Sequence, residues 1–280
     1  MTIKTFLTTG YYPSLTGGQF IILQSLEPVG IPTKFKILPE YLKDLGYATH
    51  GLGKWHLGFC HPDYLPHNRG FDSWSGLWNG GGYHYMHNLP AVRGDNDTIG
   101  FDYFKNEELD YSSLGKSTSQ LIADHAQEIL YKHVVKNTQG NNYNTSNPFF
   151  MYAAFQDGHA PLQVEEEFTD LYPNEEDLIR KKYLGMVSRL DAAVGRIVDN
   201  LQSITYTDTE DGETRSMLED TIIIFSSDNG GQSLQSFLYE GGSNLPLRGT
   251  KESFVYKVFY TESVCWSQPQ IDNTVNHFFL

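Results

Sequence analysis

Hydrophobic positions along the chain switch between helical and strand spacing, and this alternation predicts an α/β fold. Residues 36 to 46 have the apolar spacing of an amphipathic helix, with Pro39 in its first turn and Gly46 just past its end. Further helices are predicted near residues 117 to 136 and 176 to 201, and strands near 47 to 52, 148 to 155 and 221 to 225. Buried strands that alternate with helices form a mostly parallel sheet, so we expect such a sheet with helices covering both faces.

Two stretches lack such a period. Residues 58 to 115 are rich in Gly, Asn, Tyr and His, and we expect long loops there with little regular structure. Loops of this length in a compact domain are usually functional or poorly ordered. Residues 203 to 220 are polar and acidic, which predicts an exposed connection before the last strand.

Composition and charge narrow the classes of partner. The chain has 280 residues, 39% of them hydrophobic, which is enough for a buried core. Its formal net charge of −14 argues against a protein that binds nucleic acid or docks on anionic membranes, because either needs a basic surface. An acidic surface also repels an anionic substrate, so a sulfate or phosphate site here must be a local cationic pocket.

The remaining sequence features concern the cysteines and the cellular compartment. Cys60 and Cys265 are too few and too far apart for a metal cluster, a redox pair or a disulfide framework. Sequons at Asn96 and Asn144 fit a secretory protein. No apolar run is long enough to span a membrane, and the polar N-terminus shows no visible signal peptide.

Polar residues follow each of the predicted strands. The run Gly-Lys54-Trp-His56-Leu-Gly sets a cation and a titratable imidazole two residues apart in a glycine-flanked turn, which suits a compact anion. The alternative for this run is a tight turn with its Trp in the core and the polar groups in solvent. Because the carboxyl ends of parallel strands meet at one edge of a sheet, these residues should converge with those that follow the later strands.

The later strands end in His159 and in Asp228-Asn229, and Lys251 follows further along. A carboxylate and an amide carbonyl are oxygen ligands that Ca²⁺ or Mg²⁺ prefers. Taken singly, each has an ordinary explanation as well: Asp-Asn-Gly-Gly is also a turn sequence, His159 could be a loop histidine, and Lys251 a solvated lysine.

An ordered set of motifs resembles the type I sulfatase family, nearest to its arylsulfatase B group, over roughly residues 7 to 253. The motifs are Leu-Thr-Thr-Gly10, Leu-Pro-Glu-Tyr-Leu-Lys-Asp-Leu-Gly-Tyr, Gly-Lys54-Trp-His56-Leu-Gly, Asn-Arg-Gly-Phe-Asp72, Pro-Phe-Phe-Met-Tyr, His159-Ala-Pro-Leu-Gln-Val, Tyr-Leu-Gly-Met-Val-Ser-Arg-Leu-Asp, Ser-Asp228-Asn229-Gly-Gly and Leu-Pro-Leu-Arg-Gly-Thr-Lys251. The resemblance implies an alkaline-phosphatase-like α/β fold and the hydrolysis of a sulfate ester to an alcohol and inorganic sulfate.

The resemblance also implies a role for each matched residue. Lys54 would steady the nucleophile and the sulfate, and His56 would act on the nucleophile's second hydroxyl to expel sulfate. His159 and Lys251 would hold the sulfate and stabilise or protonate the leaving oxygen. Asp228 and Asn229 would ligate a Ca²⁺ that polarises the sulfate.

Departures from the family pattern lead to further expectations. The family's formylglycine nucleophile arises from a Cys-x-Pro-Ser-Arg motif, which the resemblance puts just ahead of Met1, and the paired Asp residues of the calcium site would lie further upstream. We therefore expect the fold to be truncated at both ends, the calcium site to be half present, and this chain to be inactive or impaired as given. Residues 1–253 would be a partial catalytic domain and residues 254–280 an unaligned tail.

The leading hypothesis is thus an arylsulfatase-type sulfuric ester hydrolase that acts on a sulfated small molecule or a sulfated glycan, with lysosomal or secreted residence implied by the family. One alternative is a non-catalytic sulfatase-like protein that binds sulfated glycans through Lys54, His159 and Lys251. Another is a metal-dependent phosphohydrolase of the same fold, which requires an Asp/His-rich two-metal site that the sequence does not show. The sequence leaves the oligomeric state open.

Overall fold

The protein is described by a computed structural model that covers residues 8–17, 27–89, 100–139, 142–143, 147–208, 212–233, 239–246, 249–251, 264–266 and 277–279. Its longer helices are α3 (Leu38–Asp44), α4 (Thr118–Asn137) and α6 (Leu178–Ser203), with single turns at α2 (Pro13–Thr16) and α5 (Glu166–Thr169). Short 3-10 helices span Pro62–Tyr64, Pro66–Arg69 and Tyr111–Ser113.

The main sheet has eight strands in the order β11-β10-β12-β7-β1-β2-β3-β4. Their bounds are β1 Ala48–Gly53, β2 Ser73–Gly76, β3 Phe104–Lys105, β4 Glu108–Leu109, β7 Phe149–Ala154, β10 Thr221–Phe225, β11 Val264–Trp266 and β12 His277–Phe279. The five central strands, from β10 to β2, pair in parallel, and the outer strands β11, β3 and β4 pair antiparallel. A parallel centre is what the sequence predicts, and the antiparallel edges were not foreseen.

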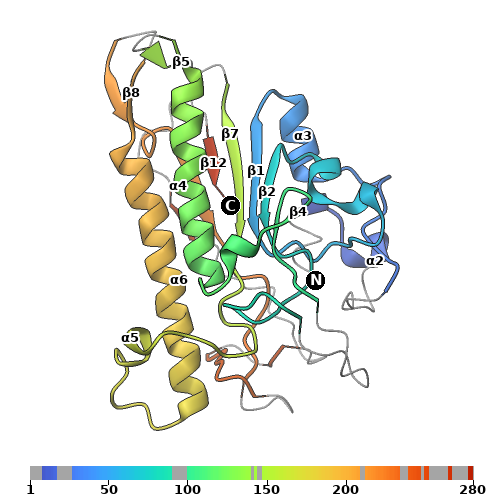
Figure 1. Ribbon diagram of the computed structural model, residues 1–280, viewed down its shortest axis with the longest axis vertical. Helices are drawn as coiled ribbons and strands as arrows, with labels where there is room; N and C mark the ends of the chain where they lie inside the picture. The colour runs from blue at the N-terminus through green and yellow to red at the C-terminus, as the bar shows by residue number, and fades with distance from the viewer. Residues whose placement is uncertain are drawn as a thin grey trace.

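Helices and chain segments cover both faces of this sheet. Figure 1 shows α4 and α6 side by side along one face, and α3 beside β1 on the other. The expected covering of both faces is confirmed. Each predicted helix and strand is present with its ends within two residues of the expected positions: α3, α4 and α6, and β1, β7 and β10.

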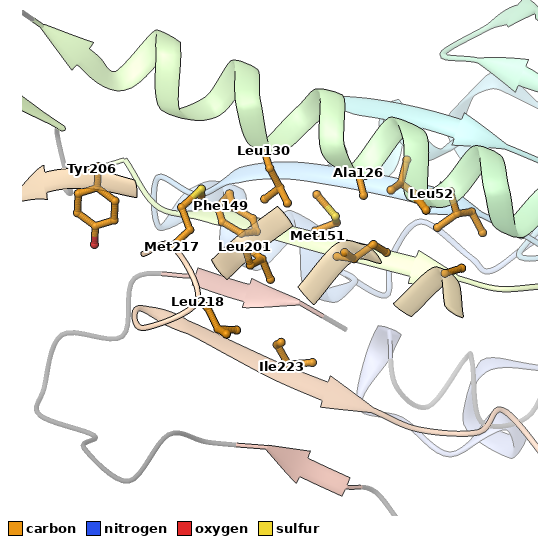
Figure 2. Packing of buried hydrophobic residues seen from close by; sticks show 14 residues of the cluster. Leu52, Ala126, Leu130, Phe149, Met151, Leu201, Tyr206, Met217, Leu218 and Ile223 are labelled. Atoms are coloured by element: carbon orange, nitrogen blue, oxygen red, sulfur yellow. The ribbon is translucent and has the colours of Figure 1, made fainter. Parts of the chain in front are cut away.

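Alternation along β7 divides the core into two clusters. Phe149 and Met151 pack with α4 and α6, while Phe150 and Tyr152 face the cluster that holds Trp55. Figure 2 shows Ala126 and Leu130 of α4 pointing toward Phe149 and Met151. Burial on both faces explains why β7 reads as a continuous apolar run in the sequence.

Two expectations about irregular stretches are wrong in part: most of the described residues between 58 and 115 are irregular as expected, but short strands occur among them. Residues 58–115 contribute β2 to the main sheet, where Gly51 pairs with Trp74, and they also form β3 and β4. Residues 203–220 form β8 (Thr205–Asp208) and β9 (Thr214–Ser216) of a second sheet, in the order β5-β6-β8-β9 with β5 at Thr138–Gln139 and β6 at Asn142–Tyr143. Three apolar side chains of this stretch are buried because they belong to the core cluster: Tyr206, Met217 and Leu218.

The segment after residue 253 also enters the main sheet. β12 lies between β10 and β7, with Ile222 paired to Phe278 and Phe278 to Phe150. β11 pairs with β10 on its other side. A boundary at residue 253 between a catalytic domain and a tail stays a prediction.

Candidate functional site

One cavity of about 590 Å³ lies at the carboxyl edge of the main sheet, where β1, β7 and β10 end. Five of the six predicted site residues line it: Lys54, His159, Asp228, Asn229 and Lys251. They come from four separate parts of the chain. The convergence expected from the strand order is therefore observed for these five.

Lys54 follows β1 directly. Its backbone N–H donates to the Ala154 carbonyl at 2.8 Å, which continues the pairing of β1 with β7 by one residue and fixes where the side chain begins. The residue is 8% exposed, and burial lowers the pKa of its ammonium. Asp228 opposes this lowering of the pKa and Lys251 adds to it. A buried cation of this kind favours an anionic ligand, because the ligand's charge would replace lost solvation.

His159 lies in a turn after β7, where its N–H donates to the Gln156 carbonyl at 3.2 Å. Its ring Nδ1 lies 2.8 Å from the Ala160 carbonyl oxygen, which can only accept, so Nδ1 carries the proton. Burial, Lys54 and Lys251 lower the pKa of His159 to about 4. The ring is thus neutral at pH 7 with its lone pair on Nε2, and a bound anion would raise its pKa.

Lys251 is held near the turn that contains Asp228 by a backbone hydrogen bond. Its backbone N–H donates to the Gly231 carbonyl at 3.2 Å. The Asn244 side chain closes the loop between Asp228 and Lys251, since its Oδ1 accepts from Gly231 N–H at 2.7 Å and its Nδ2 donates to the Gly231 and Gly249 carbonyls at 2.9 and 3.0 Å. Asp228 itself is solvent-exposed.

His56 is the predicted residue that the cavity does not include. It is buried, it has a φ of 53° in the left-handed region, and its N–H donates to the Trp78 carbonyl at 3.1 Å. A non-glycine residue in that region is uncommon and is often held there by its surroundings. Gly80 packs directly on its ring, so closely that a Cβ at residue 80 would overlap the imidazole.

The neighbouring Gly81 packs on the other imidazole. A Cβ at Gly81 would lie 3.2 Å from the His159 ring. Residues 80–88, called here the covering loop, therefore lie against both His56 and His159. Glycine at position 80 allows this close approach, and a side chain at position 81 would fit only with a small shift of the His159 ring.

Asp228 and Asn229 bear on the question of a metal. Ca²⁺ takes six to eight oxygen ligands, and these two side chains offer a carboxylate and an amide oxygen. Asn229 Nδ2 donates to the Gly230 carbonyl at 2.9 Å, which leaves its Oδ1 as the ligating atom. Across the described ranges, no three His, Cys, Asp or Glu side chains gather into a metal site. The two residues fit as part of a ligand set.

Sequence reasoning missed the residues of α6 that hold the site. Tyr183 lines the cavity and packs close to Gly158 and Gly241. Arg189 is 3% exposed and forms an ion pair with Asp157, whose side chain is fully buried. The sequence did contain an indication of this role. Arg189 lies on the same face of α6 as the buried residues Met186, Ala193 and Ile197. A charge on the apolar face of a helix implies a buried partner.

The sequence profile of the Sulfatase family matches residues 5–277. Mouse (Mus musculus) arylsulfatase J is 34% identical over 251 residues, which is 88% of this chain and 36% of that protein. Pig (Sus scrofa) N-acetylgalactosamine-6-sulfatase is 32% identical over 241 residues, which is 85% of this chain and 40% of the relative. The chain thus spans about two fifths or less of the length of these curated relatives.

Solved structures agree with the sequence comparisons. The crystal structure of Ps i-CgsB in complex with k-i-k-neocarrahexaose has a TM-score of 0.70 and 29% identity, and the match covers 89% of this chain and 51% of that one. The PsFucS1 sulfatase from Pseudoalteromonas sp. has a TM-score of 0.56 and 24% identity over 81% of this chain and 44% of its own, which shows a shared fold. The architecture is that of the alkaline-phosphatase-like sulfatases, as the sequence resemblance implies.

Proposed function

The chain belongs to the sulfatase family, and we propose that it forms the sulfate-holding part of an arylsulfatase-type sulfuric ester hydrolase. The observation that carries this proposal is the presence of two ammonium groups and an imidazole in one cavity. Lys54, Lys251 and the imidazole of His159 line one cavity in a protein whose formal net charge is −14. The carboxylates of Asp157, Asp228 and Glu240 also line the cavity, and the two ammonium groups are the local cations that an acidic protein needs to bind a sulfate ester.

The proposed roles follow from position and charge. Lys54, buried at the end of β1, would bind the sulfate oxygens as a point charge. Lys251 and His159 would hold the sulfate and stabilise or protonate the leaving oxygen. His56, outside the cavity, would act on the nucleophile of the whole protein. Asp228 and Asn229 would contribute two oxygens to a Ca²⁺ site, and a bound Ca²⁺ would polarise the sulfate.

Binding of a sulfate ester tests this proposal directly. We expect 4-nitrophenyl sulfate to bind saturably in calorimetry and 4-nitrophenol, which lacks the sulfate, not to bind. Lys251→Met should weaken binding about 10- to 100-fold, since a charge-assisted hydrogen bond contributes roughly 1.5–3 kcal/mol. Lys132→Met serves as the matched control, because Lys132 pairs with Glu128 on the surface of α4, away from the cavity. Equal binding of the ester and the phenol would contradict the proposal.

A hydrolysis assay distinguishes an enzyme that cleaves sulfate esters from a protein that only binds them. Lys54, Lys251 and His159 line the cavity, and these three groups can bind an anion whether or not it is cleaved. This favours, as a second candidate, a sulfatase-like protein that binds sulfated glycans without turnover. Saturable binding with no release of 4-nitrophenol in Ca²⁺ would support it, and release at the rate of an intact sulfatase would exclude it. We expect this chain by itself to be inactive or impaired.

The proposed substrate is a sulfated small molecule or a sulfated glycan, and the proposed residence is lysosomal or secreted. Among similar structures, Ps i-CgsB is in complex with k-i-k-neocarrahexaose and BT4656 is in complex with its substrate D-glucosamine-2-N,6-O-disulfate. The described residues contain no helix that is long and apolar enough to cross a membrane. Both sequons, at Asn96 and Asn144, fall outside the described residues. A mass decrease of the endogenous protein on enzymatic removal of N-glycans would support passage through the secretory pathway.

A further inference from the structure

We propose that Arg189 is a positioning residue for His159, because it holds both the loop that carries this imidazole and the loop that covers it. The loops are the His159 loop (residues 156–161) and the covering loop (residues 80–88). The inference rests on the proposed function, in which His159 binds the sulfate. Arg189 itself is not among the residues that line the cavity.

Each guanidinium nitrogen of Arg189 has a partner. Nε donates to Asp157 Oδ1 at 2.9 Å, and Nη2 lies 2.7 Å from the same oxygen. Nη1 donates to the Tyr85 hydroxyl at 2.8 Å and to Glu165 Oε2 at 3.2 Å. Nη2 also lies 3.2 Å from His84 Nδ1. These partners come from both loops, so one planar group on α6 fixes the distance between them.

The His159 loop is held through its first two residues. Asp157 takes the charge of Arg189 and also accepts a hydrogen bond from the Ser119 hydroxyl of α4. Gln156, which is 1% exposed, accepts from the Thr118 hydroxyl at 3.2 Å and donates to the Gly82 carbonyl of the covering loop. Residues 156 and 157 are thus fixed to α4, to α6 and to the covering loop, two residues before the imidazole.

The covering loop is held through His84. A guanidinium can only donate, so His84 Nδ1 accepts from Arg189 and the ring proton sits on Nε2. Nε2 then donates to the His159 carbonyl oxygen at 3.3 Å. Burial and Arg189 lower the pKa of His84 to about 4, against the opposing charge of Asp157, so the ring is neutral at pH 7. His84 therefore relays the position of Arg189 to the backbone of His159.

A purely stabilising role is the simpler explanation, since removing one partner of any buried ion pair destabilises a protein. The two explanations differ in what a milder substitution does. In Arg189→Lys the charge remains, but one nitrogen with three donors cannot bridge Glu165 and the three partners in the two loops. A positioning role predicts that the His159 ring moves even when the protein stays folded.

The experiment compares Arg189→Lys with Arg196→Lys in the full chain. Arg196 is the matched control, because it also lies on α6 and pairs with a carboxylate, Asp124 at 2.6 Å, but on the surface. Two readouts are needed: the dissociation constant of 4-nitrophenyl sulfate, and the pKa of the His159 imidazole from its NMR titration. Circular dichroism shows whether each variant is folded.

For Arg189→Lys we expect a dissociation constant raised about 10- to 100-fold, the range found when residues that orient a ligand-binding side chain are lost. The pKa of His159 should rise from about 4 toward its ordinary value of 6.5, because a displaced ring regains solvent and leaves the two lysines. Arg196→Lys should change neither readout beyond twofold or a few tenths of a unit. A folded Arg189→Lys protein with wild-type values of both readouts would overturn the proposal.

A second pair of variants covers the case in which Arg189→Lys does not fold. His84→Gln keeps one acceptor and one donor, whereas His84→Leu removes both while leaving the Arg189–Asp157 pair intact. Positioning predicts wild-type titration of His159 in the first and a raised pKa in the second, and equal titration in both would overturn it. If the wild-type chain binds no sulfate ester, the proposed function fails, while the titrations still decide the role of Arg189.

Discussion

The two walls of the cavity are built in different ways. The wall that carries His159 is held by buried charged and polar side chains: Asp157 is fully buried and paired with Arg189. The wall that carries Asp228 and Lys251 is held by the hydrogen bonds of Asn244 to backbone groups, and Asp228 is exposed. The first wall is held by a buried ion pair, and the described part of the second wall is held by hydrogen bonds between neutral groups in a partly exposed region.

This difference has a functional meaning under the proposed activity. An imidazole must present one particular nitrogen to a bound sulfate ester, so its loop needs a fixed orientation. A lysine ammonium is a point charge on a flexible stem and tolerates small displacements. The rigid wall therefore carries the group whose direction matters, and the more adaptable wall carries the cation and the two oxygen ligands.

The largest predicted contrast is in stability. Asp157→Ala removes the fully buried partner of Arg189 and leaves only the partly exposed Glu165, so it should lower the free energy of unfolding by about 3 kcal/mol. Asp228→Ala, on the exposed wall, should change it by no more than about 0.5 kcal/mol. Urea unfolding measures the free energy of unfolding of both variants, provided that their m-values are the same as that of the wild type. Similar losses for the two variants would remove the distinction between the walls.

The second contrast is in pH dependence. The pKa of fully buried His84 is about 4 in the folded state and 6.5 when unfolded, so the unfolded chain binds a proton first as the pH falls. Neutral His84 contributes its full share to the free energy of unfolding above pH 6.5. This contribution of about 3 kcal/mol is lost as the pH falls from 6.5 to 4. His84→Gln should remove this part of the loss. The opposite wall, residues 226–251, contains no histidine.

The smallest contrast concerns the hydrogen bonds of the second wall. Asn244→Ala should lower the free energy of unfolding by about 1–2 kcal/mol, since three hydrogen bonds to backbone groups are lost in a partly exposed site. The NMR titration of His159 should not change in this variant. Asn68→Ala is the control, because Asn68 donates to the Pro62 carbonyl on the surface. A shifted His159 titration in Asn244→Ala would show that the walls are coupled.

Much of the fold follows from periodicity in the sequence. Strands β1, β7 and β10 and helices α3, α4 and α6 are long enough for their apolar spacing to be recognised. Strand β2 was missed because Ser-Trp-Ser-Gly is short and sits among polar residues, and its pairing with β1 is a tertiary contact. The core residues Tyr206, Met217 and Leu218 were missed because acidic neighbours mask them.

The sequence predicted those residues of the candidate site that follow strands, and it missed those that meet only through tertiary packing. Lys54, His159 and Asp228 follow strands, so topology alone brings them together. Arg189 and Asp157 are 32 residues apart in the sequence and meet only through packing of α6 on the His159 loop. The buried stripe of α6 marks Arg189 as unusual, but no local pattern names its partner. His56 was expected in the cavity but is not among its lining residues, and its ring packs against Gly80 of the covering loop.

The most direct test of the account is the pH dependence of sulfate-ester binding. A bound sulfate should raise the pKa of His159 from about 4, so binding takes up a proton and the affinity for 4-nitrophenyl sulfate should increase as pH falls from 7, by up to about tenfold per unit. His159→Gln should bind more weakly and lose this dependence. Calorimetry in buffers of different ionisation enthalpy measures the proton uptake. Binding that is independent of pH in the wild type, or equally pH-dependent in His159→Gln, would contradict the account.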